Sequence, residues 1–214
     1  VNNFVQSGMN LGLGTGSTAA YAVAALAERV STEGLVLGKI VATSAETAQL
    51  AHFHGLTVEP DIIDSVGHID VTIDGADEVD PDLNVIKGAG GALLREKLVA
   101  VQTKREVIIV DASKVVEKLG LKYPLPVMVV PYAYETTASR IEAIIGRKPI
   151  LRPTHTGENF ISDDGLFCLD IPPGPIENPA KIAAEIKALT GVVDVGLFIG
   201  LTDTLVIAGA DGKV

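Results

Sequence analysis

A loop rich in glycine and hydroxyl side chains lies near the start of the chain, Gly12-Leu-Gly14-Thr15-Gly16-Ser17-Thr18, before an alanine-rich segment. The run Met9–Leu13 is typical of a β-strand, so the loop would join a strand to a helix and gather three hydroxyls and several backbone N–H groups at the helix start. Such a nest binds anions, phosphate above all. The loop lacks the third glycine of G-x-G-x-x-G and the Gly-Lys-Ser/Thr of a P-loop, which weakens a dinucleotide or ATP site. An ordinary glycine turn with Ser17 or Thr18 as N-cap is the alternative.

A carboxylate cluster, Asp74-Gly-Ala-Asp77-Glu78-Val-Asp80, directly follows the predicted strand Ile69–Ile73. Carboxylates at a strand end raise the question of a metal site. A calcium loop has acids at alternate positions before a glycine, whereas Gly75 follows the first acid here, so that template fails. No His or Cys accompanies the cluster, and we therefore expect no metal. A solvated acidic turn is the alternative.

The next candidate is a lysine and glycine loop, Lys87-Gly-Ala-Gly-Gly91, which opens a predicted helix over Ala92–Gln102. That helix carries Glu96, which shares a stripe with the apolar Ala92 at i−4 and with Val99 and Ala100 at i+3 and i+4. Desolvation on such a stripe would make the carboxylate a stronger base. The alternative is a surface glutamate, because cationic residues flank it on both sides.

Two other strand ends carry polar residues. The strand Val107–Val110 leads into Asp111-Ala-Ser113-Lys114, which adds a cation to the group. The strand Lys39–Ala42 leads into Thr43 and Glu46, whose spacing is that of a helix capping box.

Short β-rich runs and helical segments alternate through the first half of the chain. The strands expected there are 9–13, 39–42, 69–73, 85–86 and 107–110, and the helices are 18–29, 46–54 and 92–102. This rhythm predicts an open, mostly parallel α/β sheet. Because ligands of such sheets bind beyond the carboxyl ends of the strands, we expect the polar residues to meet at one edge.

The order of elements changes after Tyr123-Pro-Leu-Pro126. The expected elements are a strand at 127–130, a helix at 135–145, strands at 160–162 and 166–170, a helix from Pro179 that ends just before Gly191, and a strand at 192–195. This is the β-α-β-β-α-β order of ferredoxin-like domains. A last strand, 205–208, could rejoin the first sheet. The predicted domains are 1–126 with 197–214, and 127–196.

Composition limits the partners. The 214 residues carry 17 Lys and Arg against 27 Asp and Glu, a net charge of −10, and only 4% are aromatic, which argues against nucleic acid and anionic membranes. The single cysteine, Cys168, excludes an internal disulfide and fits a reducing compartment, so we expect a cytoplasmic or stromal protein. The four His residues lie outside the polar loops. Together these features indicate a site for a small, polar, phosphorylated substrate.

The strings that carry these residues, in chain order, resemble the signature segments of A-type ribose-5-phosphate isomerases. They are Gly12–Ala19, Asp74–Asp80, Lys87–Lys97, Val110–Lys114 and Tyr123–Pro126. The segments Ile176–Pro179 and Gly191–Phe198 also resemble that family. The resemblance implies a Rossmann-like catalytic domain with helices on both faces of its sheet, a smaller ferredoxin-like domain, and a homodimer or homotetramer. It also implies interconversion of ribose 5-phosphate and ribulose 5-phosphate in the pentose phosphate pathway without metal or cofactor.

The resemblance also assigns roles. Glu96 matches the family's general base, and Asp74, Asp77 and Lys87 match the groups around the reacting oxygens of the sugar, with no division of ring opening between the two Asp residues. The residues that match substrate-binding positions are Thr15, Gly16, Ser17, Thr18, Asp74, Gly75, Ala76, Asp77, Lys87, Gly88, Ala89, Gly90 and Lys114.

Two departures from the family pattern stand out. Ala89 replaces a glycine of many members, which should be tolerated only if its φ is negative. The resemblance also implies a helix before the first strand, with a lysine near the phosphate, and we expect the given sequence to hold only the end of that helix.

Two other classes of protein share parts of this pattern. A sugar-phosphate sensor domain of a transcriptional regulator would usually carry a DNA-binding helix pair, which this sequence lacks. A nicotinamide-dependent oxidoreductase would use the glycine loop, and the missing third glycine argues against it.

Overall fold

The structure is a computed structural model, and it describes residues 1–60 and 68–209. The chain forms two compact units. Unit 1 comprises 1–75, 95–112 and 201–214, and unit 2 comprises 76–94 and 113–200. The predicted domains have different bounds, since 76–94, 113–126 and 197–200 lie in unit 2, and the domain division stays a proposal. Within the described residues, no helix is both long and apolar enough to span a bilayer.

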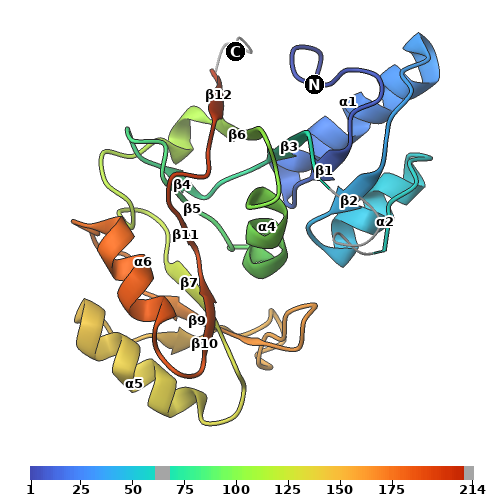
Figure 1. The fold of residues 1–214 in the computed structure, drawn as a ribbon. Helices are drawn as coiled ribbons and strands as arrows, with labels where there is room; N and C mark the ends of the chain where they lie inside the picture. The colour runs from blue at the N-terminus through green and yellow to red at the C-terminus, as the bar shows by residue number, and fades with distance from the viewer. Residues whose placement is uncertain (61–67, 210–214) are drawn as a thin grey trace. The chain divides into compact units, whose positions relative to one another are not determined.

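Unit 1 contains a five-stranded parallel sheet in the order β12-β6-β3-β1-β2 (Figure 1). The strands are β1 (Leu11–Leu13), β2 (Ile40–Ala42), β3 (Val71–Asp74), β6 (Glu106–Asp111) and β12 (Thr204–Ala208). Every pair is parallel, and β12 runs along β6 from Thr204 beside Val107 to Ala208 beside Asp111. The predicted parallel sheet and the return of the last strand are confirmed.

Helices cover both faces of this sheet. The helices of the first half of the chain are α1 (Ser17–Glu33), α2 (Ala45–Phe53) and α4 (Leu93–Ala100). Leu11 and Leu13 share a buried cluster with residues of α1 and α2. Gly12 points to the opposite face, where a Cβ would lie 2.8 Å from Val99 of α4. Because neighbouring strand residues face opposite sides, α1 and α4 lie on different faces of the sheet. The missing side chain of Gly12 allows this close packing.

The first two helices are set by local sequence. In α1 the buried residues Ala19, Val23, Leu26 and Ala27 follow helical spacing, and Gly34 ends the helix in the left-handed region with φ 68°. In α2 the N-cap is Ser44, whose hydroxyl accepts from the Thr47 N–H at 3.0 Å. The predicted Thr43–Glu46 capping pair is therefore wrong by one residue.

Unit 2 contains a four-stranded antiparallel sheet in the order β10-β7-β9-β8 (Figure 1). Its elements are β7 (Leu125–Val129), α5 (Tyr134–Ile145), β8 (Ile150–Leu151), β9 (Phe167–Ile171), α6 (Pro179–Lys187) and β10 (Val192–Val195). This order confirms the predicted ferredoxin-like topology. Alternate strand residues such as Val127, Leu169 and Val195 share a buried cluster with Ile141 of α5 and Ile186 of α6, so both helices pack on one face.

Three predicted elements of unit 2 are wrong in detail. The second strand is β8, not 160–162, where only Ile161 makes an isolated bridge, to Phe167. Helix α6 ends at Lys187, so Gly191 lies beyond its cap. The predicted parallel strand at 85–86 is β5 (Val85–Ile86), which lies in a separate antiparallel sheet with β4 (Glu78–Val79) and β11 (Leu197–Phe198).

Candidate active site

The loop between β1 and α1 is built around a close backbone approach. A Cβ on Gly14 would lie 2.2 Å from Oδ1 of Asp74, so only glycine fits there. This approach lets the Thr15 N–H donate to the same oxygen at 3.1 Å. Gly16, with φ 102°, is the N-cap of α1, and no side chain caps the helix. The predicted alternative, with Ser17 or Thr18 as the cap, is therefore wrong, and both hydroxyls lie in the first turn of α1.

The Thr15 side chain is used within the protein. Its Oγ1 lies 2.7 Å from Thr43 Oγ1, 2.8 Å from Ser44 Oγ and 3.2 Å from Thr47 Oγ1. Thr47 in turn donates to the Gly14 carbonyl at 3.0 Å. These bonds tie the loop to the start of α2, so the Thr15 hydroxyl holds the loop in place. The first-turn N–H groups of α1 have no acceptor within the helix.

Asp74 ends β3 and is fully buried. Its Oδ1 accepts from the Gly75 N–H at 2.7 Å as well as from Thr15. These charge-assisted bonds orient the carboxylate at the carboxyl end of the sheet. Unit 1 therefore brings Asp74 and the Thr15–Thr18 loop together, as the sequence predicts.

Glu96 is buried in α4, with 5% of its surface exposed. Val99 and Ala100, one turn further on, are buried as well, whereas the intervening Leu98 is 44% exposed. The apolar stripe expected around Glu96 is therefore present, and the alternative of a surface glutamate is wrong. A carboxylate in such a place is poorly hydrated, which suits a group that must exchange a proton with carbon.

Unit 2 contains the Lys87–Gly91 loop and its neighbours. Asp77 Oδ2 accepts from the Ala89 N–H at 2.9 Å, and the Lys87 N–H donates to the Gly196 carbonyl at 2.9 Å. Lys87 is 3% exposed and its Nζ lies 5.7 Å from the centroid of the Phe198 ring. Ala89 does not have a positive φ, whereas Gly88 does, at 109°. Ala89 therefore satisfies the condition under which the family's glycine can be replaced.

Lys114 ends a short 3₁₀ turn, Ala112–Lys114, and is oriented by a tyrosine. Its Nζ donates to the Tyr123 hydroxyl at 2.7 Å and lies 4.1 Å from the centroid of that ring. In the sequence Tyr123 is visible only as part of the Tyr123–Pro126 motif, which does not reveal this contact.

The acidic cluster is mostly buried, so the alternative of a solvated turn is wrong for it. Glu78 is fully buried and accepts backbone N–H groups from Gly120, Lys122 and Tyr123 at 2.5, 2.5 and 2.7 Å. Asp80 accepts from the Asn84 N–H at 2.8 Å and forms a local turn. These two acids hold loops of unit 2 in place. Among the described residues, no three His, Cys, Asp or Glu side chains are grouped as metal ligands would be.

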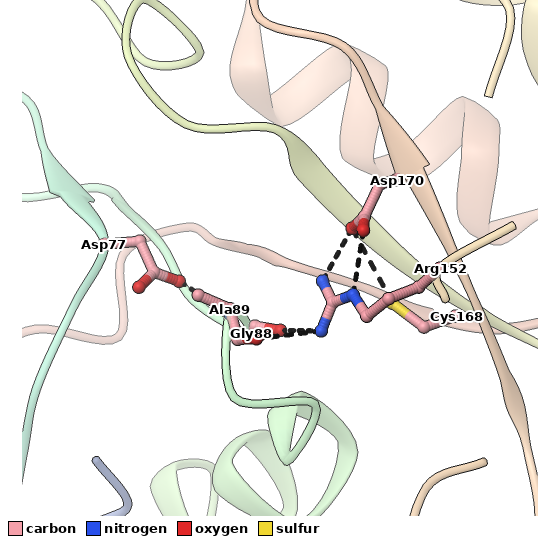
Figure 2. Close-up of polar contacts among 6 residues, drawn as sticks. All are labelled: Asp77, Gly88, Ala89, Arg152, Cys168 and Asp170. Carbon is pink, nitrogen blue, oxygen red and sulfur yellow. Dashed lines mark hydrogen bonds and ion pairs between the residues drawn. The ribbon is translucent and has the colours of Figure 1, made fainter. Parts of the chain in front are cut away.

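Two further residues of unit 2, Arg152 and Asp170, are not predicted by the sequence. Figure 2 shows Arg152 between the Asp170 carboxylate and the carbonyls of Gly88 and Ala89. The partners are 18 residues and more than 60 residues from Arg152 in the sequence, so no local motif reveals them.

Comparison with known proteins decides the family. A sequence model described as ribose 5-phosphate isomerase A (phosphoriboisomerase A) matches residues 39–212. The ribose-5-phosphate isomerase A of Synechococcus sp. (strain JA-3-3Ab) is 49% identical over 210 residues, which are 97% of this chain and 89% of the relative. This chain belongs to the ribose 5-phosphate isomerase A family. Asp74, Asp77, Lys87 and Glu96 all lie in the part matched by the family model.

Solved structures of ribose 5-phosphate isomerases share the fold. The enzyme from Plasmodium falciparum is 35% identical, with a TM-score of 0.93, over 99% of this chain and 91% of that one. A D-ribose-5-phosphate isomerase in complex with phospho-erythronic acid is 33% identical, with a TM-score of 0.92, over 98% of this chain and 91% of that one. The Rossmann-like and ferredoxin-like architecture expected from the resemblance is confirmed.

Proposed function

We propose that this protein interconverts D-ribose 5-phosphate and D-ribulose 5-phosphate, as an aldose–ketose isomerase of the pentose phosphate pathway. Membership of the ribose 5-phosphate isomerase A family carries this proposal. The phospho-erythronic acid bound by a structural relative combines a phosphate with a carboxylate, and so supports a sugar phosphate as the ligand.

Glu96 is the proposed general base. Its carboxylate would take the proton from C2 of the open-chain aldose, and the electron pair left behind would form the C1=C2 bond of an enediolate. Return of the same proton to C1 would complete the ketose, with O1 and O2 exchanging their protons through a second group. The burial of Glu96 beside Val99 supports this role, because a poorly hydrated carboxylate is a stronger base.

The remaining polar residues have proposed roles around the substrate. Lys87 would stabilise the negative charge that develops on the reacting oxygens. Asp77 and Asp74 are the candidates for moving protons at those oxygens and for opening the furanose ring. The substrate-binding positions proposed with them are Gly75, Ala76, Gly88, Ala89, Gly90 and Lys114.

The start of α1 is the proposed phosphate site. The N–H groups of its first turn carry no intrahelical bond, and the helix dipole favours an anion there. No side chain makes a capping hydrogen bond at Gly16. This supports the proposal, because the Ser17 and Thr18 hydroxyls do not cap the helix.

The decisive test is an isomerisation assay on ribose 5-phosphate with a strong chelator present. We expect ribulose 5-phosphate to form at an undiminished rate, because the proposed chemistry needs only side chains. Absence of turnover with and without added divalent ions would refute the isomerase. Loss of turnover on chelation that a divalent ion restores would refute only the metal-free mechanism. Light scattering on the same sample tests the proposed homodimer or homotetramer.

A further inference from the structure

The Arg152 guanidinium joins two parts of unit 2. Its Nε donates to Asp170 Oδ2 at 2.8 Å and its Nη2 to Asp170 Oδ1 at 2.6 Å, which is the bidentate geometry of a strong ion pair. Its Nη1 donates to the carbonyls of Gly88 and Ala89, at 2.9 Å each (Figure 2). One side chain thus connects the Asp170 carboxylate of β9 to the backbone of the Lys87–Gly91 loop.

The charge on Arg152 is maintained despite burial. Its side chain is 12% exposed and that of Asp170 is 21% exposed. Burial lowers the pKa of Arg152. The hydrogen bond and the charge of Asp170 raise this pKa, and on balance the pKa lies above its ordinary value. A permanent cation therefore faces the two carbonyls, and bonds from a charged donor are stronger than neutral ones.

The same segment of the chain also contacts the other end of the loop. Arg152 lies 5.5 Å from the centroid of the Phe160 ring, and a Cβ on Gly91 would lie 2.1 Å from Phe160 Cζ. Gly91 has φ 83°, which also requires glycine. Arg152 and Phe160 together therefore constrain the loop from Gly88 to Gly91.

Peptide geometry gives these contacts a direction. No described peptide bond is cis, and in a trans peptide the C=O and N–H groups point to opposite sides. The carbonyls of Gly88 and Ala89 face Arg152, so the N–H groups of Ala89 and Gly90 point away from it. The Ala89 N–H indeed donates to Asp77 Oδ2 on the other side of the loop. The Gly90 N–H therefore points away from Arg152 as well.

We propose that Arg152, braced by Asp170, is a positioning residue that holds the Lys87–Gly91 loop so that the Gly90 N–H faces the reacting oxygens of the substrate. This proposal rests on the proposed isomerase function. Arg152 touches no substrate in this account. It acts through two peptide groups, whose N–H dipoles it orients and polarises. A preorganised donor of this kind stabilises charge that develops in the transition state more than it stabilises the bound sugar.

The test compares Arg152→Met with a matched control, Arg147→Met. Arg147 makes the same kind of contact elsewhere in unit 2, since its Nη1 donates to the carbonyls of Pro172 and Gly174 at 2.8 Å each. We expect Arg152→Met to lower kcat by about 10²-fold with little change in KM, as misplacing an oxyanion donor does. We expect Arg147→Met to keep kcat within about twofold although it also loses thermal stability.

Two further measurements separate positioning from general damage. Added guanidinium ion, well below denaturing concentrations, should raise the kcat of Arg152→Ala toward the wild-type value and should leave the kcat of Arg147→Ala unchanged. Amide hydrogen exchange at 88–91 should be faster in the conservative variants Arg152→Lys and Asp170→Asn than in wild type and Arg147→Lys. This exchange is measured without substrate, so it tests whether Arg152 holds the Lys87–Gly91 loop even if Arg152→Met does not fold.

The outcomes are distinct. A wild-type kcat in folded Arg152→Met, or unchanged exchange at 88–91 in the conservative variants, would overturn the positioning role and leave the isomerase intact. A wild-type protein that does not isomerise ribose 5-phosphate would instead overturn the proposed function, and with it the catalytic part of this inference.

Discussion

Glu96 and Glu106 are both buried carboxylates of unit 1, with 5% and 3% of their surfaces exposed. They differ in their elements. Glu106 begins β6, at the amino end of a parallel strand, whereas Glu96 lies on α4 in the segment that follows the glycine loop. Ligands of parallel sheets bind at the carboxyl ends of the strands, so the position of Glu106 does not suit chemistry, whereas Glu96 is the proposed base. Glu106 therefore serves as a control.

We predict that Glu96→Gln lowers kcat by about 10²- to 10⁴-fold, the usual contribution of a general base, because the amide cannot accept a proton. Exchange of the substrate C2 hydrogen with deuterated water should decrease to the same extent, while ribose 5-phosphate should still raise the Tm. Glu106→Gln should change the Tm but not kcat. Wild-type exchange in Glu96→Gln would assign proton removal to another residue, and Asp77 would be examined first.

Thr18 provides a test of the phosphate site. We predict that Thr18→Val raises KM for ribose 5-phosphate, because the variant removes a hydroxyl beside the first-turn N–H groups of α1. Unphosphorylated ribose, a much poorer substrate, should show little change. Steady-state kinetics on both sugars provides the comparison, and an equal loss for both would place Thr18 at the sugar or in the fold.

Tyr123 provides a test of how Lys114 is oriented. We predict that Tyr123→Phe raises KM by about fivefold, equivalent to about 1 kcal/mol, because the ring stays but the hydroxyl that accepts from Lys114 is lost. Tyr134→Phe is the matched control, since the Tyr134 ring packs against Phe167 in the same unit. Equal KM values for the two variants would show that the Tyr123 hydroxyl does not contribute to substrate binding.

The elements that the sequence predicts well are those with enough residues to show a period. Helix α1 spans 17 residues with apolar positions at helical spacing, and β3 and β6 are buried over most of their length. The two-residue strands β4 and β11 are too short to show a period, so the sequence does not predict them. The sequence predicts their partner β5 as a strand but places it in the wrong sheet, because two adjacent apolar residues have the same pattern in parallel and antiparallel sheets.

The candidate site was predictable where it depends on the chain itself. The motifs brought Thr15 and Asp74 together correctly, because each follows a strand of one parallel sheet. The side chain of Thr15 could not be placed, since its partners come from the next strand and helix. Likewise, nothing local distinguishes Glu78, which binds the N–H groups of a distant loop, from Asp77 beside it.

The turn after β1 allows a test of close packing. We predict that Gly14→Ala greatly lowers the Tm or prevents folding, because the new Cβ would lie 2.2 Å from Asp74 Oδ1 and 2.4 Å from its Cα. Gly75→Ala is the steric control, since its Cβ would meet nothing closer than 3.8 Å and its φ is not positive. Thermal melts of both variants make the comparison. Similar Tm values would show that the turn can shift to make room for the new Cβ.

Each unit of the molecule has its own buried core, one around β1 and α1 and one around β7 and α5. The protein carries a net charge of −10, which repels anions at long range. An anionic substrate must therefore be held by local groups, and the described candidates are the α1 N-terminus, Lys87 and Lys114.

Cys168, the only cysteine, reports on the folding of unit 2, in which β9 lies. It is fully buried in β9, and burial, opposed in part by Arg152, raises the pKa of its thiol to about 12 from an ordinary value near 9. Because the thiolate is the reactive form, native protein should resist alkylation at pH 8 and react only when it unfolds. Iodoacetamide labelling along a urea titration should follow the unfolding curve, and fast labelling of native protein would contradict this burial.

The same shift predicts a pH dependence of stability. Above about pH 9 the unfolded chain loses the thiol proton while the native protein keeps it until about pH 12, so the native state binds more protons. The free energy of unfolding should therefore fall between those two pH values, and this contribution should be fully present below pH 9. Urea unfolding of wild type and Cys168→Ala across this range measures the effect. The difference between the two proteins should shrink as the pH rises, because the alanine variant has no proton to retain, and a constant difference would show that the buried thiol ionises like that of the unfolded chain.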